Sequence, residues 1–113
     1  MRSAITMADD SMWSLVMFDL PVLTLAQRRA ANRFRNLLLD RGYAMLQFSV
    51  YVRYLPTGGG QDHSTIEALR HNLPPGGDVR MLYVSDRQWS NTLRFHNATE
   101  EKPEPAPVQL TIF

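Results

Sequence analysis

Asp19 is the first residue whose type and place in the chain could do chemistry. It ends the apolar run of residues 13–19, Trp-Ser-Leu-Val-Met-Phe-Asp, and Leu20-Pro21 follows it. A carboxylate is a hard oxygen ligand of the kind that Mg²⁺ prefers. The same position also suits a residue that begins a turn before a proline. The residues alone leave both interpretations of Asp19 open.

Ser49 is a second polar side chain of interest. It shares an alternating pattern with Gln47 and Tyr51. A serine hydroxyl can donate a hydrogen bond to a phosphate or to a metal-bound water. An ordinary strand residue or a dimer contact would explain Ser49 equally well.

Arginine dominates the basic residues, because only Lys102 among the 12 Lys and Arg side chains is a lysine. The planar guanidinium grips phosphate with two hydrogen bonds, which lysine cannot do. Four arginines lie largely off the apolar stripe of one predicted helix: Arg28, Arg29, Arg33 and Arg35. They suit non-specific phosphate contacts whose affinity falls with salt. A solvated helix face or codon usage in a GC-rich genome is the alternative.

Several other kinds of site are excluded or disfavoured. The chain has no cysteine, so it forms neither a disulfide framework nor a thiolate metal site. The glycines at 58–60 lack the Lys-Ser/Thr pair of a phosphate-binding loop. The histidines have no metal-ligand spacing: His63, His71 and His96. The net charge of +1 does not by itself demand a nucleic-acid partner.

The length of 113 residues fits one domain. No apolar run approaches the roughly 20 residues of a membrane span. We expect residues 1–12 to be a disordered leader rather than a signal peptide, since they hold Arg2, Asp9 and Asp10 and no apolar block. The absence of cysteine agrees with a cytoplasmic location, which we expect for this chain.

The hydrophobic pattern predicts a strand over 13–19 and then an amphipathic helix. Thr24 with Gln27 forms a capping-box pattern, and Gly42 supplies the stop. Residues 43–55 predict one long strand, because apolar and other side chains alternate with a period of two. Its core face would carry Leu46, Phe48, Val50 and Val52. Its other face would carry Met45, Gln47, Ser49, Tyr51 and Arg53.

The second half of the chain continues with shorter elements. A helix from about 64 ends before the Pro-Pro-Gly-Gly of 74–77, and strands are expected at 78–85 and, more weakly, at 92–96. The prolines of 97–107 predict an extended linker. Residues 108–113 have a strand pattern. The folded domain is therefore expected over 13–96, followed by the linker and terminal strand.

These elements predict an α+β protein: a ferredoxin-like βαββαβ-type antiparallel sheet with two helices on one face and a C-terminal tail strand. The opposite face would expose Leu15, Met17, Asp19, Gln47, Ser49 and Tyr51. An uncovered face of this kind is a liability, and a second copy of the chain is its simplest cover. The tail strand would then reach the partner's sheet edge, or else fold back on its own sheet.

Three segments together resemble the CRISPR-associated protein 2 family, over about residues 12–96. They are the strand Val16–Pro21, the Arg-rich helix from Arg28 to Gly42-Tyr43, and Gln47-Phe48-Ser49-Val50-Tyr51. The resemblance implies a ferredoxin-like homodimer in CRISPR antiviral defence. It also implies partnership with the CRISPR-associated integrase on double-stranded DNA during spacer acquisition.

The resemblance further implies an endonuclease that cleaves RNA or DNA with Mg²⁺ or Mn²⁺. The family's metal-binding carboxylate ends the first strand, which places it at Asp19, and Ser49 is the second candidate catalytic residue. One carboxylate per chain provides few ligands for a metal ion, and the two-fold axis of a dimer would add the Asp19 of the second copy. Two alternatives stay open: a non-catalytic scaffold that holds DNA, and a toxin-type ribonuclease or regulatory module on the same fold.

Overall fold

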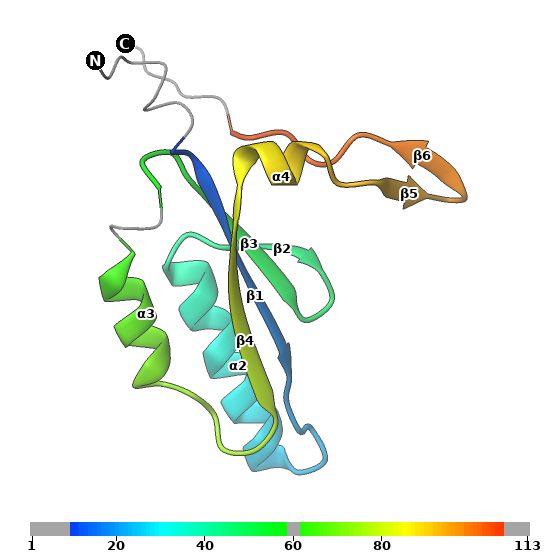
Figure 1. Ribbon diagram of the computed structural model, residues 1–113. Coiled ribbons are helices and arrows are strands. Elements are labelled where there is room, and N and C mark those ends of the chain that lie inside the picture. Colours follow the sequence, from blue (N-terminus) through cyan, green and yellow to red (C-terminus); the bar gives the residue numbers. More distant parts are fainter. Residues whose placement is uncertain (1–9, 59–61, 108–113) are drawn as a thin grey trace.

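The computed structural model describes residues 10–58 and 62–107, and it contains a four-stranded antiparallel sheet in the order β2-β3-β1-β4 (Figure 1). The strands are β1 Met12–Asp19, β2 Ala44–Gln47, β3 Val50–Leu55 and β4 Asp78–Ser85. Helix α2 (Leu25–Asp40) connects β1 to β2, and α3 (His63–Arg70) connects β3 to β4. The α+β class is confirmed, and the order of elements is that of the predicted ferredoxin-like fold.

Helix α2 forms where the sequence predicts it. The Thr24 hydroxyl accepts from the Gln27 backbone N–H at 3.1 Å, and the Gln27 side chain accepts from the Thr24 N–H at 3.0 Å. This reciprocal pair satisfies two donors that the first turn leaves without partners. The helix ends at Asp40, and Gly42 follows the C-cap residue Arg41 with a φ of 90°, which suits glycine.

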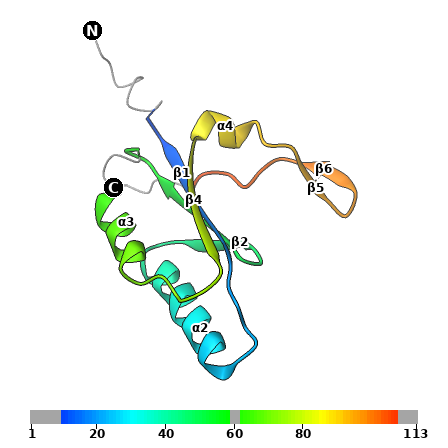
Figure 2. The same ribbon diagram turned by 60° about the horizontal axis from the view of Figure 1, so that its bottom comes forward.

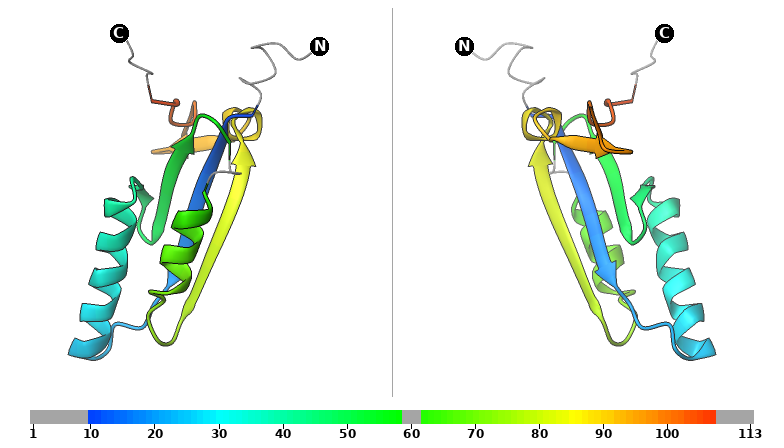
Figure 3. Two further views of the ribbon diagram at one scale, coloured as in Figure 1. Left: turned by 90° about the vertical axis from the view of Figure 1, so that its left-hand side faces the viewer. Right: turned by 90° about the vertical axis from the view of Figure 1, so that its right-hand side faces the viewer.

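Both long helices lie on one face of the sheet (Figure 3). The buried core lies between these helices and the sheet. The buried cluster comes from all layers of the domain: Val16, Phe18, Phe34, Leu38, Tyr43, Tyr51 and Leu69. The Phe18 ring meets Phe34 edge-on, with centroids 5.4 Å apart, and lies 5.7 Å from the Tyr51 ring. Phe18 on the central strand therefore joins the sheet to α2.

The single long strand predicted over 43–55 is wrong, because the chain reverses at Phe48 and Ser49. Gln47 pairs with Val50, and Ser49 has a φ of 65°, the left-handed conformation of a tight hairpin turn. The predicted faces are wrong as well. Tyr51 lies opposite Val16 and is buried in the core, so it is not a residue of the open face.

The chain after β4 also differs from the prediction. A short helix, α4 (Asp86–Ser90), follows at once, and β5 (Arg94–His96) pairs with β6 (Thr99–Glu101) in a separate hairpin (Figure 2). The strand expected near 92–96 therefore does not join the main sheet, and the expected linker contains a paired strand. The predicted tail strand (108–113) and most of the predicted leader (1–9) lie outside the described residues.

Two further points concern the limits of the domain. Strand β1 already begins at Met12, and the proposed boundaries at 13 and 96 stay predictions. Among the helices of the described ranges, none has the length and apolar character needed to cross a membrane.

The face of the sheet without long helices is partly covered at one end. The Trp89 ring of α4 stacks on Trp13 with centroids 4.4 Å apart, and the Trp13 indole donates to Asp86 at 2.8 Å. The β5–β6 hairpin crosses in front of the same end (Figure 3). The rest of this open face carries a set of apolar side chains at intermediate or high exposure: Leu15, Met17, Val50, Val52 and Leu82.

A polar network lies on the helix side of the sheet, beneath α3. The Tyr83 hydroxyl donates to Asp62 at 2.5 Å, and Arg53 pairs with the other oxygen of the same carboxylate at 3.1 Å. The Ser14 and Tyr43 hydroxyls lie 2.6 Å apart. No described buried side-chain polar atom lacks a partner. This network ties the start of α3 to β3 and β4.

Replacing Tyr83 by Phe tests this network. Removing one hydrogen bond to the buried carboxylate should lower the free energy of unfolding by about 1.5–3 kcal/mol in urea titrations at neutral pH. Val84→Ala, on the opposite face of β4, is the comparison for general damage to the strand. A Tyr83→Phe protein as stable as the wild type would contradict the role given to the network.

The pH dependence gives a second test of the same hydroxyl. Burial raises the pKa of the Tyr83 phenol above its ordinary value of 10.0, and the hydrogen bond and negative charge of Asp62 raise it further. The folded state thus favours the neutral phenol. The contribution of this phenol to the free energy of unfolding is complete below pH 10 and should fall as the pH rises above 10. Tyr83→Phe should reduce this alkaline loss, while the raised pKa of Tyr43 leaves part of it.

Candidate metal and nucleic-acid site

Two carboxylates lie side by side where β1 ends and β4 begins. Asp19 is the direct antiparallel partner of Asp78, and both residues are exposed. Directly opposed residues point to the same face, with Cβ atoms about 5 Å apart. The structure thus adds a second acidic residue to the predicted Asp19, within a single chain.

Ser49 lies at the same end of the sheet. The Phe18 backbone N–H donates to the Ser49 carbonyl at 3.1 Å, which fixes the hairpin turn beside the last residues of β1. Together these segments line a hollow of about 430 Å³, whose residues are Met17, Phe18, Asp19, Phe48, Ser49, Val50, Asp78 and Arg80. The two predicted catalytic residues, Asp19 and Ser49, therefore line one hollow.

Arg80 supplies a positive charge to this hollow. It lies opposite Met17 on β1, two residues along β4 from Asp78, and so shares the open face with both carboxylates. The residue is exposed, and its guanidinium has no ion pair with the described residues. An arginine free of a carboxylate partner suits the binding of a phosphate group.

The turn before β4 holds the Asp19 backbone in place. Gly77 has a φ of 74°, and a side-chain carbon at this residue would overlap the Asp19 carbonyl oxygen. The neighbouring Gly76 has a similar φ of 77°, but its added carbon would meet only the Pro21 side chain, at 3.2 Å. Glycine is needed at 77 both for its backbone conformation and for this close approach.

The four arginines of α2 that were predicted to bind phosphate have different surroundings in the structure. Arg28 donates to the carbonyl oxygens of Val22 and Leu23, both at 3.2 Å, and so ties down the loop before the helix. Arg35 is half-buried over the Phe18 ring. Arg29 and Arg33 are exposed and have no hydrogen bond or ion pair with residues 10–58 or 62–107. Arg29 and Arg33 therefore have the guanidinium groups most accessible to a phosphate, and the phosphate-binding role of all four arginines stays a prediction.

The donor set fits a weakly held magnesium ion. Mg²⁺ commonly binds one or two carboxylates, keeps several waters and uses a substrate phosphate. Asp19 and Asp78 provide the two carboxylates. In the described part of the chain, no three His, Asp or Glu side chains gather closely enough to hold a metal by themselves. His63, His71 and His96 are not among the residues that line this hollow.

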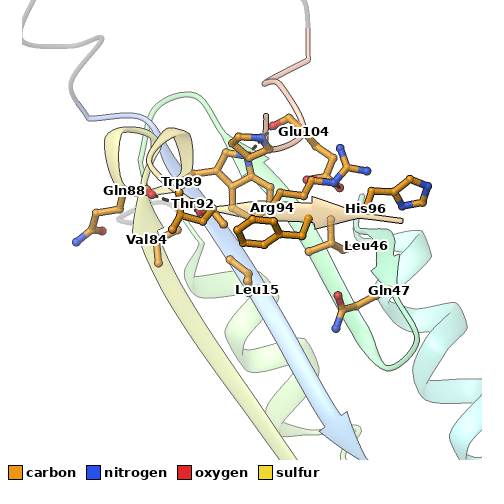
Figure 4. A pocket seen from close by; sticks show the side chains of 13 residues that line it. Leu15, Leu46, Gln47, Val84, Gln88, Trp89, Thr92, Arg94, His96 and Glu104 are labelled. Atoms are coloured by element: carbon orange, nitrogen blue, oxygen red, sulfur yellow. Dashed lines mark hydrogen bonds and ion pairs between the residues drawn. The ribbon is translucent and has the colours of Figure 1, made fainter. Parts of the chain in front are cut away.

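A second cavity, of about 560 Å³, lies at the other end of the open face, beneath the β5–β6 hairpin (Figure 4). Its apolar wall includes Leu15, Leu46 and Val84, and the Trp89 indole donates to the Glu104 carbonyl at 2.6 Å. Arg94 at its rim pairs with Glu101 and Glu104, each at 3.7 Å. Its arginine is already neutralised, so this cavity is a poorer phosphate site than the carboxylate hollow.

The sequence missed Asp78 because no local pattern marks it. It follows Pro-Pro-Gly-Gly and begins a strand, which resembles an ordinary turn residue. Only the register between β1 and β4, which are far apart in the sequence, places it beside Asp19. One sequence feature could have indicated the pair. Asp19 ends one predicted strand and Asp78 begins another, and these two positions meet if the strands are antiparallel neighbours.

Fold and site together define a small ferredoxin-like domain with a carboxylate pair and an arginine at the end of its central strand. The family model of the CRISPR associated protein Cas2 matches residues 12–92. The chain therefore belongs to the Cas2 family, as the three sequence segments predicted.

Individual relatives agree with this assignment. The CRISPR-associated endoribonuclease Cas2 of Paracidovorax avenae is 42% identical over 102 residues, which cover 90% of this chain and 94% of the relative. The protein of the same name from Flavobacterium psychrophilum is 33% identical over 91% of this chain and 89% of its own length. That of Acidovorax ebreus is 49% identical over 68% of this chain and 74% of its own.

The Gly76-Gly77 turn allows a matched test of the site's geometry. Gly76→Ala should lower the free energy of unfolding by about 1–3 kcal/mol, because alanine is strained at positive φ. Gly77→Ala should lower the free energy of unfolding further, because the Asp19 carbonyl must also move. In two-dimensional NMR spectra, only Gly77→Ala should shift the amide signals of Asp19 and its neighbours on β1 strongly. Equal shifts in both variants would show that Gly77 has no special role in placing Asp19.

Proposed function

We propose that this chain is a metal-dependent endoribonuclease whose reaction centre is the hollow between Asp19 and Asp78. The main support for this proposal is the direct pairing of these two aspartates in a hollow that Ser49 and Arg80 also line. The relatives named above are called endoribonucleases, which supports the same activity and RNA as substrate. The metal would be Mg²⁺ or Mn²⁺.

Each side chain has a defined part in phosphodiester hydrolysis. Asp19 and Asp78 would hold the cation, which when bound polarises phosphate oxygens and lowers the pKa of a bound water. Arg80 would donate hydrogen bonds to the non-bridging oxygens of the scissile phosphate and so fix its position. Ser49 would orient the attacking water by a hydrogen bond. The attacking water would bond to phosphorus and release one proton to solvent, while the bond to the leaving oxygen breaks and that oxygen takes up one proton from solvent.

A second copy of the chain would complete this centre. The open face carries Met17, Val52 and Leu82 without cover from a long helix, and Leu82 is 47% exposed. A two-fold dimer through this face would bury these side chains. It would also bring the carboxylate pairs of two chains toward a common seam. The proposed homodimer is thus both a cover for apolar surface and a source of further ligands.

Asp19→Asn tests the nuclease. The amide keeps the shape of the side chain but removes its charge, so cleavage of single-stranded RNA with Mg²⁺ should fall at least about 100-fold. Asp78→Asn should also reduce cleavage, about 10-fold or more, because the cation loses one of its two carboxylate ligands. Initial rates on a labelled oligoribonucleotide provide the measurement, with every variant purified in parallel.

Asp86→Asn is the matched control, because Asp86 lies at the opposite end of β4 and bonds to Trp13. It should cleave at the rate of the wild type when compared below its melting temperature. Equal cleavage by the wild type and Asp19→Asn would identify a contaminating nuclease and refute the proposal.

Leu82→Asp tests the homodimer. A charge in the middle of β4, on the open face, should weaken self-association at least about 10-fold in sedimentation experiments, because the carboxylate would have to be buried unpaired. Leu73→Asp is the comparison, since Leu73 is 51% exposed but follows α3 on the other side of the molecule. A dimer unaffected by Leu82→Asp, or a wild type that is a monomer throughout, would place the interface elsewhere or exclude it.

The second candidate function is a scaffold without catalysis. The lack of a third acidic or histidine ligand near Asp19 in the described residues favours it. In this role the dimer would hold double-stranded DNA through Arg29 and Arg33 and bind the CRISPR-associated integrase during spacer acquisition. Metal-independent duplex binding that survives Asp19→Asn, together with no cleavage by the wild type, would favour this function over the nuclease.

A further inference from the structure

We propose that Phe48 is a stacking platform for one unpaired nucleobase of the RNA, beside the carboxylate hollow. This inference rests on the proposed function and names the form of substrate that the site selects. Aromatic side chains bind single-stranded nucleic acid by stacking on its bases. Three observations on Phe48 support the inference: its exposure, its contact with Arg35 and its position in the hollow.

Phe48 is unusually exposed for its type. Its exposed fraction is 78%, whereas Phe18 and Phe34 are buried in the core. It lies in the tight turn between β2 and β3. Of the two turn residues only Ser49 has a positive φ, so the backbone at Phe48 does not require a particular residue type. The turn therefore does not need a phenylalanine, and the ring is presented to solvent.

Arg35 supports the ring from the protein side. Its guanidinium carbon lies 5.8 Å from the Phe48 centroid and 6.0 Å from the Phe18 centroid. A hydrogen bond of 3.0 Å to the Asn32 side chain helps to hold this guanidinium. The contact limits the freedom of an exposed side chain before any ligand binds. Less ordering then remains to be done on binding, which favours affinity.

The platform borders the reaction centre. Phe48 lines the same 430 Å³ hollow as Asp19, Asp78 and Arg80, and it directly precedes Ser49. A base that stacks on Phe48 would bring the sugar-phosphate chain of its own nucleotide toward the carboxylates and Arg80. The ring would thus place the scissile phosphate, in addition to increasing affinity.

Stacking on Phe48 requires a base that is not already stacked on both sides. Bases in a duplex meet their neighbours, whereas those of single strands, loops and bulges can turn outward onto an aromatic ring. Every base has a face that can stack on an aromatic ring, so we expect preference for unpaired RNA without strong sequence specificity.

Binding measured without cleavage tests the platform. In EDTA, the full chain is titrated with a short oligoribonucleotide and with duplex RNA of the same sequence. Phe48→Ala should weaken binding of the single strand about 5- to 100-fold and change duplex binding little. Phe48→Tyr keeps a ring and should bind as the wild type does. Phe95→Ala is the matched control, because Phe95 is 65% exposed on β5, outside the hollow.

Phe48→Trp gives a direct optical readout. Its added fluorescence should be quenched by the single strand and much less by the duplex, since stacking on a base quenches indole emission. The wild type, with Trp13 and Trp89 buried, is the blank. Oligoribonucleotides without bases should bind the wild type and Phe48→Ala with the same affinity.

Three results would overturn the inference: unchanged binding in Phe48→Ala, an equal loss in Phe95→Ala, or a loss of self-association in Phe48→Ala, which would assign the ring to the contact between two copies. Asp19→Asn separates this inference from the nuclease. If it abolishes cleavage while Phe48→Ala leaves binding intact, the nuclease stands without the platform. If binding depends on Phe48 and the wild type does not cleave RNA, the platform stands without the nuclease.

Discussion

The register of β1 between β3 and β4 is the constraint on which the rest of the structure depends. Val16 and Phe18 face the helices, while Met17 and Asp19 face the other way. Since side chains alternate strictly along a strand, a slip of one residue would turn Phe18 out and Asp19 toward the core. Burial of two apolar side chains therefore fixes the orientation of the carboxylate, and the ladder to β4 sets Asp78 beside it.

The same central strand carries polar groups on its buried side, and this affects how α3 is held. Ser14 is fully buried next to Tyr43, and Asp62 at the start of α3 is matched by Arg53 and Tyr83. A buried carboxylate is tolerated only with such partners. Helix α3 is therefore positioned by directional bonds in addition to the apolar contact of Leu69, whereas α2 is positioned mainly by apolar contact through Phe34 and Leu38.

The sequence predicted β1, α2 and β4, because each of these elements carries a local signal such as an apolar run or a capping box. These elements were enough to predict the fold class. The prediction of the strand over 43–55 failed at Phe48 and Ser49. The alternation continues through the turn, and neither residue is the Gly or Asn that marks a hairpin. That one omission reversed the assigned faces of the segment and placed Tyr51 on the wrong side. Asp19 and Ser49 were identified, but their common hollow depends on pairings that no local pattern contains.

On the proposed function, a site with only two exposed carboxylates would depend on other groups to bind its metal ion. Solvent competes well with so few ligands, so the chain alone would hold a divalent ion weakly. A phosphate brought in by Arg80 would add oxygen ligands, and a second copy of the chain would add carboxylates. Each of these contributions would raise metal affinity, and by linkage the metal would raise affinity for the substrate and for the second copy to the same degree. On the proposed function, metal, nucleic acid and dimer would thus be coupled, and the catalytic centre would be complete only with all three together.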